Sequence, residues 1–152
     1  MISFSAHLTG DQENPPNASM GEGWANATLD TSNNWFTFHE EWVGLSAGAT
    51  ASHIHGPAPA GMNAPVLIPF VLATHDTDGE ADFLGFLTDL QVDQLMGGLF
   101  YVNVHTANYP AGEIRGQLLA TPVPEPSAYA LVGMAMLGLL VVRRKFSTRK
   151  MS

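Results

Sequence analysis

The sequence predicts an all-β domain, a Greek-key β-sandwich or barrel with one short helix, followed by a C-terminal hydrophobic helix. Short runs that alternate apolar and polar residues fill positions 2–121, as in strands with one buried face. Turns rich in Gly, Pro and Asn separate these runs at the spacing found in sandwiches and barrels. A proline-rich segment then precedes an uncharged apolar stretch. We therefore divide the chain into a β-domain, residues 1–121, and a tail, residues 122–152.

Seven or eight short strands are expected in the domain. The first, ISFSAHL, alternates apolar and polar residues, and the third carries two phenylalanines and Trp42 on one side. The fifth, APVLIPFVL, is almost continuously apolar, which predicts that it is well covered. The expected strands are residues 2–8, 23–30, 34–45, 50–56, 64–72, 81–87, 99–106 and 112–120.

One helix is expected between the late strands, in the stretch TDLQVDQLMGG. Thr88 is a suitable N-cap, and Gln91 three residues later completes a capping box. Gly97 or Gly98 can adopt the left-handed conformation that ends a helix. This helix is the one exception to the β character of the domain.

The charges of the chain are segregated. Thirteen of the 14 acidic residues precede Thr121, but only one of the six basic residues, Arg115, does so, which gives this part a formal charge of −12. Such a surface repels phosphate backbones, so we expect no binding to nucleic acid. The chain has no cysteine, which excludes disulfides and thiolate metal sites.

The tail has a different composition from the domain. Prolines at positions 122, 124 and 126 prevent a helix there. Residues 127–142 are uncharged and would span about 24 Å as a helix, which flanking arginines can extend toward the ~30 Å of a hydrocarbon core. The basic cluster that follows predicts a cytoplasmic C-terminus, with the domain on the far side of the membrane.

A Val-Pro-Glu-Pro motif, a hydrophobic segment and an Arg-rich end follow one another in the tail. Together they resemble the PEP-CTERM sorting signal of bacteria. The resemblance implies export, membrane anchoring through the helix, processing by an exosortase, and a place at the cell surface or in an extracellular polysaccharide or protein matrix. The first residues, MISFSAHLTG, show no basic or apolar region of a signal peptide. The residues that match the sorting signal are Val123, Pro124, Glu125, Pro126, Arg143 and Arg144.

Four histidines are expected on the outer face of the sandwich. Side chains alternate across a strand, so a neighbour of a core-facing residue points outward. Each of these histidines neighbours an apolar residue, as His53 and His55 do on either side of Ile54. The same parity places His105 and His39 on the outer face.

Strand pairing predicts which of these side chains meet. A turn near Ala47 would pair the third and fourth strands, with His39 opposite His55 and Glu41 opposite His53. These opposed pairs depend on the register, because a slip of one residue would reverse every face.

The last hairpin is expected to turn near Tyr109. This register pairs His105 with Glu113 and Asn103 with Arg115. We interpret Arg115 as one half of a surface ion pair with Glu113 or another surface carboxylate.

Histidines from neighbouring strands suit copper or zinc. Glu113 or Glu41 could orient a ligand histidine through its second ring nitrogen. The alternative is that these histidines are solvated or hydrogen-bonded side chains that hold no ion.

Three stretches, AHLTGDQENPP, ASHIHGPAPAGMNAPV and YVNVHTANYPAGEIRGQL, resemble the CHRD domain over positions 2–120. The resemblance implies an immunoglobulin-like β-barrel that is similar to copper/zinc superoxide dismutases. It matches His53 and His55 to a copper-binding pair and His105 to a later copper ligand. The dismutase disulfide has no counterpart, and His75 and Asp78 are the only candidates for a zinc subsite.

The leading hypothesis is an exported, non-enzymatic surface protein. Its domain would bind a partner or a matrix component, with copper or zinc held by His53, His55, His105 and His39. One alternative is a dismutase-like, metal-dependent oxidoreductase, which the acidic surface disfavours because it repels superoxide. The other is a purely structural matrix module without metal.

Overall fold

Nine antiparallel strands and one α-helix make up residues 1–121, the part of the chain that the computed structural model describes. The all-β prediction with one short helix is therefore confirmed, while the expected hydrophobic helix and the sorting signal lie outside the described residues. A 3₁₀ turn, Gly10–Gln12, follows the first strand. The strands are β1 (Ile2–Thr9), β2 (Glu22–Asp30), β3 (Trp35–Val43), β4 (Ala49–His55), β5 (Val66–Pro69), β6 (Gly79–Phe86), β7 (Tyr101–Thr106), β8 (Ile114–Gln117) and β9 (Leu119–Ala120).

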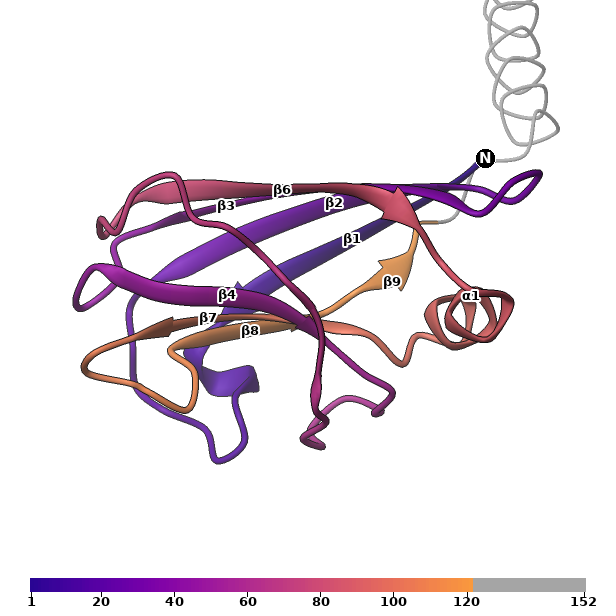
Figure 1. The fold of residues 1–152 in the computed structure, drawn as a ribbon. Coiled ribbons are helices and arrows are strands. Elements are labelled where there is room, and N and C mark those ends of the chain that lie inside the picture. Colours follow the sequence, from indigo (N-terminus) through magenta and orange to yellow (C-terminus); the bar gives the residue numbers. More distant parts are fainter. Residues whose placement is uncertain (122–152) are drawn as a thin grey trace, which may run out of the picture. The chain divides into compact units, whose positions relative to one another are not determined.

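The strands form one sheet that curls on itself. They are hydrogen-bonded in the order β5-β4-β7-β8-β1-β2-β3-β6, and β9 also pairs with β1. Because the sheet curls, β1, β2, β3 and β6 form one layer above β4, β7 and β8 (Figure 1). The inner faces of the two layers enclose the core.

The core consists mainly of alternate strand residues that point inward, together with Leu95 of the helix and Leu118 between the last two strands. Each large apolar side chain that is removed from water contributes roughly 1.5–3 kcal/mol to folding. The largest apolar side chains that are fully buried are Trp42, Phe4, Phe36, Phe100, Leu8, Leu29, Ile54, Leu95, Ile114 and Leu118.

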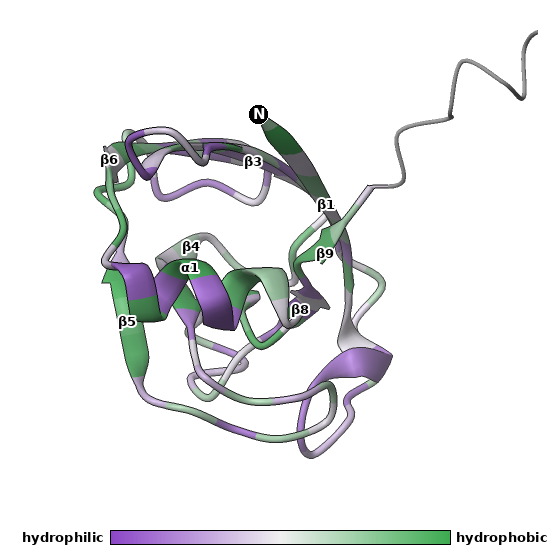
Figure 2. Cartoon of the chain, turned by 90° about the vertical axis from the view of Figure 1, so that its right-hand side faces the viewer, coloured by the Kyte–Doolittle hydropathy of each residue, from purple (hydrophilic) through white to green (hydrophobic). Residues whose placement is uncertain are grey.

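The helix α1 (Asp89–Met96) lies across one end of the barrel (Figure 2). Its predicted capping box is present, since Thr88 Oγ1 accepts from Gln91 N and Gln91 Oε1 accepts from Thr88 N. Gly98 adopts φ +67° just beyond the helix, as expected for a left-handed ending. Within residues 1–121, no helix is long and apolar enough to cross a membrane.

The outer face of β4, β7 and β8 is covered by protein. The loops that join β1 to β2 and β4 to β5 lie over it (Figure 1), and Asn63 Nδ2 of the second loop donates to Asn14 O of the first at 3.0 Å. Tyr101, Asn103 and Arg115 point outward as parity predicts, yet each is at most 3% exposed. This face therefore forms a second, polar interior, and the candidate site lies at its edge.

Candidate metal centre

Three histidines converge on the outer face of β4 and β7. His53 and His55 alternate with Ile54, which is fully buried in the core. In the β4–β7 pairing, His53 lies opposite Asn103 and Ala51 lies opposite His105, so His105 is the diagonal neighbour of His53. Potential ligand nitrogens of the three rings all lie within 4.8 Å of one another.

Two rings lie nearly at the separation that a shared ion requires. His53 Nδ1 is 3.2 Å from His105 Nε2. Two nitrogens bound tetrahedrally to one ion at ~2.0–2.1 Å are separated by about 3.3 Å. The third ring completes a triangle, because the His55 centroid lies 5.4 Å from that of His53 and 6.2 Å from that of His105.

Backbone carbonyls orient two of the three imidazoles. His55 Nδ1 lies 2.9 Å from Ala64 O, and His105 Nδ1 lies 3.0 Å from Pro110 O. A carbonyl oxygen only accepts, so in His55 and His105 the proton is on Nδ1 and the lone pair is on Nε2. The Nε2 of His105 accepts a hydrogen bond from His53 Nδ1. His55 Nε2 is buried and has no hydrogen-bond partner within the described residues. A buried nitrogen with a bare lone pair fits a metal ligand well.

The surroundings keep the three rings neutral. Burial, together with the neighbouring His105 and His55, lowers the pKa of His53 to about 4. Burial also lowers the pKa of His55 and of His105, although their carbonyl contacts act in the opposite direction. Neutral imidazole is the form that binds a cation, so the site needs no deprotonation at pH 7.

Arg115 is buried and does not form the expected surface ion pair with Glu113. The last hairpin has the predicted register, with Asn103 opposite Arg115. However, the guanidinium donates to Asn63 Oδ1 at 2.8 Å and to Met62 O. The loop between β4 and β5 closes over this position, so the guanidinium meets backbone and amide oxygens instead of a surface carboxylate.

Glu13 is buried in the same polar interior, and the alternation of residues in the strands does not predict its burial. Its Oε1 accepts from Asn103 Nδ2 at 2.5 Å. Burial raises the pKa of Glu13 to about 7, although the charge of Arg115 and the bonds from Asn103 and Asn14 act to lower it. Glu13 lies in a loop, where alternation carries no information about burial.

Glu113 does not orient His105, contrary to the predicted second-sphere role. Its Oε1 accepts from Ser19 Oγ and Ser46 N, both at 2.6 Å, and its Oε2 accepts from Ser46 Oγ and from Thr106 Oγ1. Burial acts to raise the pKa of Glu113, but these hydrogen bonds outweigh it and lower the pKa. The carboxylate therefore joins three segments of chain, and Pro110 O is the partner of His105.

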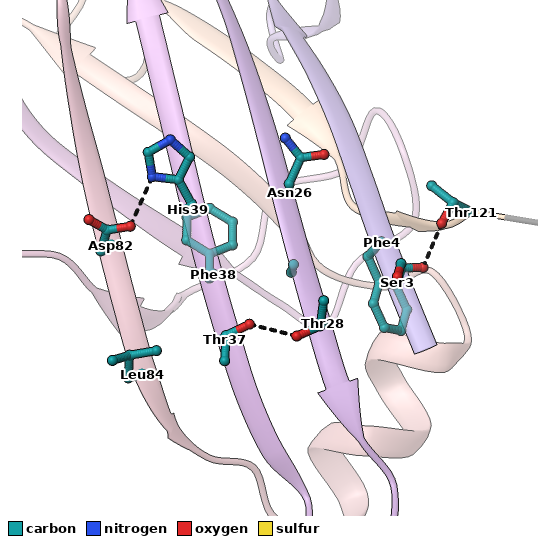
Figure 3. Close-up of a pocket in the computed structure, with 11 residues that line it drawn as sticks. Ser3, Phe4, Asn26, Thr28, Thr37, Phe38, His39, Asp82, Leu84 and Thr121 are labelled. Atoms are coloured by element: carbon teal, nitrogen blue, oxygen red, sulfur yellow. Dashed lines mark hydrogen bonds and ion pairs between the residues drawn. The ribbon is translucent and has the colours of Figure 1, made fainter. Parts of the chain in front are cut away.

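His39 lies away from the other three histidines, because the predicted pairing of β3 with β4 is wrong. β3 pairs with β2 and β6, which places His39 opposite Asn26 and Asp82. His39 Nδ1 lies 2.9 Å from Asp82 Oδ1, at the rim of a shallow pocket of about 440 Å³ on the other layer (Figure 3). The same pairing places Glu41 opposite Trp24, far from its expected partner His53. The short connection after β3 crosses between layers and does not form a hairpin.

Two family models match the chain. Residues 4–118 match the model of the CHRD domain, and residues 122–145 match the model of the PEP-CTERM protein-sorting motif. No curated protein matches the chain. The sorting motif marks an exported protein that is associated with the membrane or cell surface and is processed by an exosortase.

Proposed function

This chain belongs to the CHRD domain family, and we propose that its domain is the metal-binding, non-enzymatic module of an exported surface protein. His53, His55 and His105 would hold one copper or zinc ion, and His39 would take no part. The single observation that carries the proposal is the 3.2 Å separation of His53 Nδ1 and His105 Nε2 beside the buried His55 Nε2, which has no hydrogen-bond partner in residues 1–121.

The donor set supports this assignment. Three imidazole nitrogens suit copper and zinc, whereas calcium and magnesium require oxygen ligands. Hydrogen bonds to Ala64 O and Pro110 O hold two ligand rings in the tautomer that exposes Nε2. Three protein ligands leave a coordination position for water or for a group of a partner. A copper or zinc ion would supply Lewis acidity at that position.

Metal analysis of the full-length protein tests the proposal. After loading with copper or zinc and removal of free ion, we expect one ion per chain. The double variant His53→Ala/His55→Ala keeps one ligand nitrogen, and His105→Ala keeps two. We expect neither variant to retain the ion, because too few ligands remain. His39→Ala is the matched control, since it removes an imidazole from the other layer, and it should retain one ion.

Two outcomes would reverse the proposal. Wild-type protein that retains no metal would leave a purely structural module. Copper that is retained together with superoxide turnover would favour the dismutase-like oxidoreductase.

A further inference from the structure

The side chains of His55, a candidate metal ligand, and of Arg115 both stack on the ring of Tyr101. The His55 and Tyr101 rings are stacked, with centroids 4.8 Å apart and planes 2° apart. Arg115 Cζ lies 3.6 Å from the centroid of the Tyr101 ring. Since β7 lies between β4 and β8, His55 and Arg115 approach Tyr101 from opposite sides. The three side chains form a continuous stack that leads to the candidate centre.

This stack is held rigidly. The Ala64 backbone N–H donates to Tyr101 Oη at 3.1 Å, and the carbonyl of the same residue accepts from His55 Nδ1. Arg115 is 2% exposed and is held by Asn63 and Met62. Its charge is therefore fixed in place and poorly screened by water.

We propose that Arg115, acting through Tyr101, makes this centre selective for Cu⁺ over Cu²⁺. This inference rests on the proposed function, and it assigns Arg115 as a selectivity residue that does not touch the ion.

The physical reason is the charge balance of the site. The three donors are neutral imidazoles, so nothing in the donor set compensates the charge of a bound ion. Repulsion by a fixed cation is twice as large for a doubly charged ion as for a singly charged one. At a separation of roughly 8–10 Å and an effective dielectric constant of about 20, this difference changes the relative affinity about twentyfold.

Glu13 is the neighbouring group of opposite sign. Arg115 acts on it electrostatically, and its carboxyl group accepts from Asn103, which lies opposite His53 in the β4–β7 pairing. When ionised, this carboxylate offsets part of the field of Arg115. Removing its charge should therefore change selectivity in the direction opposite to that caused by removing Arg115.

The experiment measures the dissociation constants of the full-length protein for Cu⁺ and Cu²⁺ by competition with chelators of known affinity, at pH 8. The quantity of interest is the ratio of the Cu²⁺ constant to the Cu⁺ constant. Arg115→Gln should lower this ratio about twentyfold, while Arg115→Lys, which keeps the charge, should stay within about twofold of wild type. Glu13→Gln, which keeps an oxygen for Asn103, should raise the ratio. His39→Ala is the control and should leave it unchanged.

The outcomes separate this inference from the proposed function. Wild-type protein that binds neither ion contradicts the metal centre itself. If both ions bind and the ratio of the two dissociation constants is the same in wild type and Arg115→Gln, only the role of Arg115 is contradicted. The same conclusion follows if Arg115→Gln and Arg115→Lys change this ratio equally. If Arg115→Gln does not fold, Glu13→Gln decides, because an unchanged or lowered ratio contradicts the electrostatic argument.

Discussion

Ser52 Oγ donates a hydrogen bond to Glu40 Oε1 across the interior of the barrel, and both residues are 0% exposed. Glu40 lies on the inner face of β3, in line with Phe38 and Trp42, and its Oε2 has no hydrogen-bond partner within the described residues. Ser52 immediately precedes His53 in β4. A carboxyl group in the apolar core thus lies directly behind the strand that carries two of the candidate ligands.

Glu40 should make the domain less stable as the pH rises. Burial raises the pKa of Glu40 to about 8, although the bond from Ser52 acts to lower it. Between the unfolded value of 4.5 and about 8, the folded chain holds a proton that the unfolded chain has lost. The free energy of unfolding therefore falls with pH in this window, by at most about 1.4 kcal/mol per pH unit.

Glu40→Gln should remove this pH dependence of the free energy of unfolding. The stability of the variant relative to wild type should therefore increase from pH 5 to pH 8. Urea denaturation at three pH values measures it, with Glu41→Gln, an exposed neighbour on β3, as the control. Parallel stability curves for wild type and Glu40→Gln would contradict the burial argument.

Glu113→Gln should destabilise the domain by about 2–3 kcal/mol at pH 7, since hydrogen bonds to a charged acceptor are lost. The lowered pKa of Glu113 means that its contribution is present above the unfolded value of 4.5 and disappears as the pH falls through the folded value. The difference from wild type should thus shrink below about pH 4.5 in denaturant titrations. Glu80→Gln, an exposed carboxylate on β6, should change little. A difference that persists at low pH would count against this account.

Gly112→Ala should disrupt the polar interior beside the three histidines. Gly112 has φ +136°, and an added Cβ would overlap Asn103 Nδ2 and Glu13 Oε1, the two atoms of one hydrogen bond. We expect a loss of about 2–4 kcal/mol by thermal or denaturant unfolding. The matched control is Gly61→Ala, at φ +79° with open space around the Cβ, which should cost about 1 kcal/mol. Equal losses in the two variants would show that backbone strain alone matters.

Replacing Pro124-Glu125-Pro126 by three alanines should keep the protein in the membrane fraction, because the exosortase would no longer process it. Immunoblots of membrane and medium measure the distribution. The control is Ser147→Ala/Thr148→Ala, which lies beyond the matched motif at residues 122–145. Unchanged release of the alanine variant would show that the matched motif does not direct processing.

Local rules predicted several parts of this protein well. Alternation placed Ile54, Val102 and Val104 in the core and the histidines on the opposite face. The capping residues of α1 and the register of the last hairpin were also predicted, because each depends on residues that are close in sequence. The burial of Glu40 was not predicted, although it lies at an alternate position between Phe38 and Trp42, because an acidic residue is rarely found in a core.

The sequence by itself determined the approximate positions of the strands, the faces to which their side chains point, and the presence of a sorting motif in the tail. Only the tertiary structure decided that β3 pairs with β2 and β6, which removes His39 from the site, and that β4 pairs with β7, which brings His105 to His53. It also decided that loops bury Arg115 and supply the carbonyls of Ala64 and Pro110. The reason is physical. Alternation and turn chemistry act over a few residues, whereas pairing between distant strands depends on how the whole sheet closes around its core.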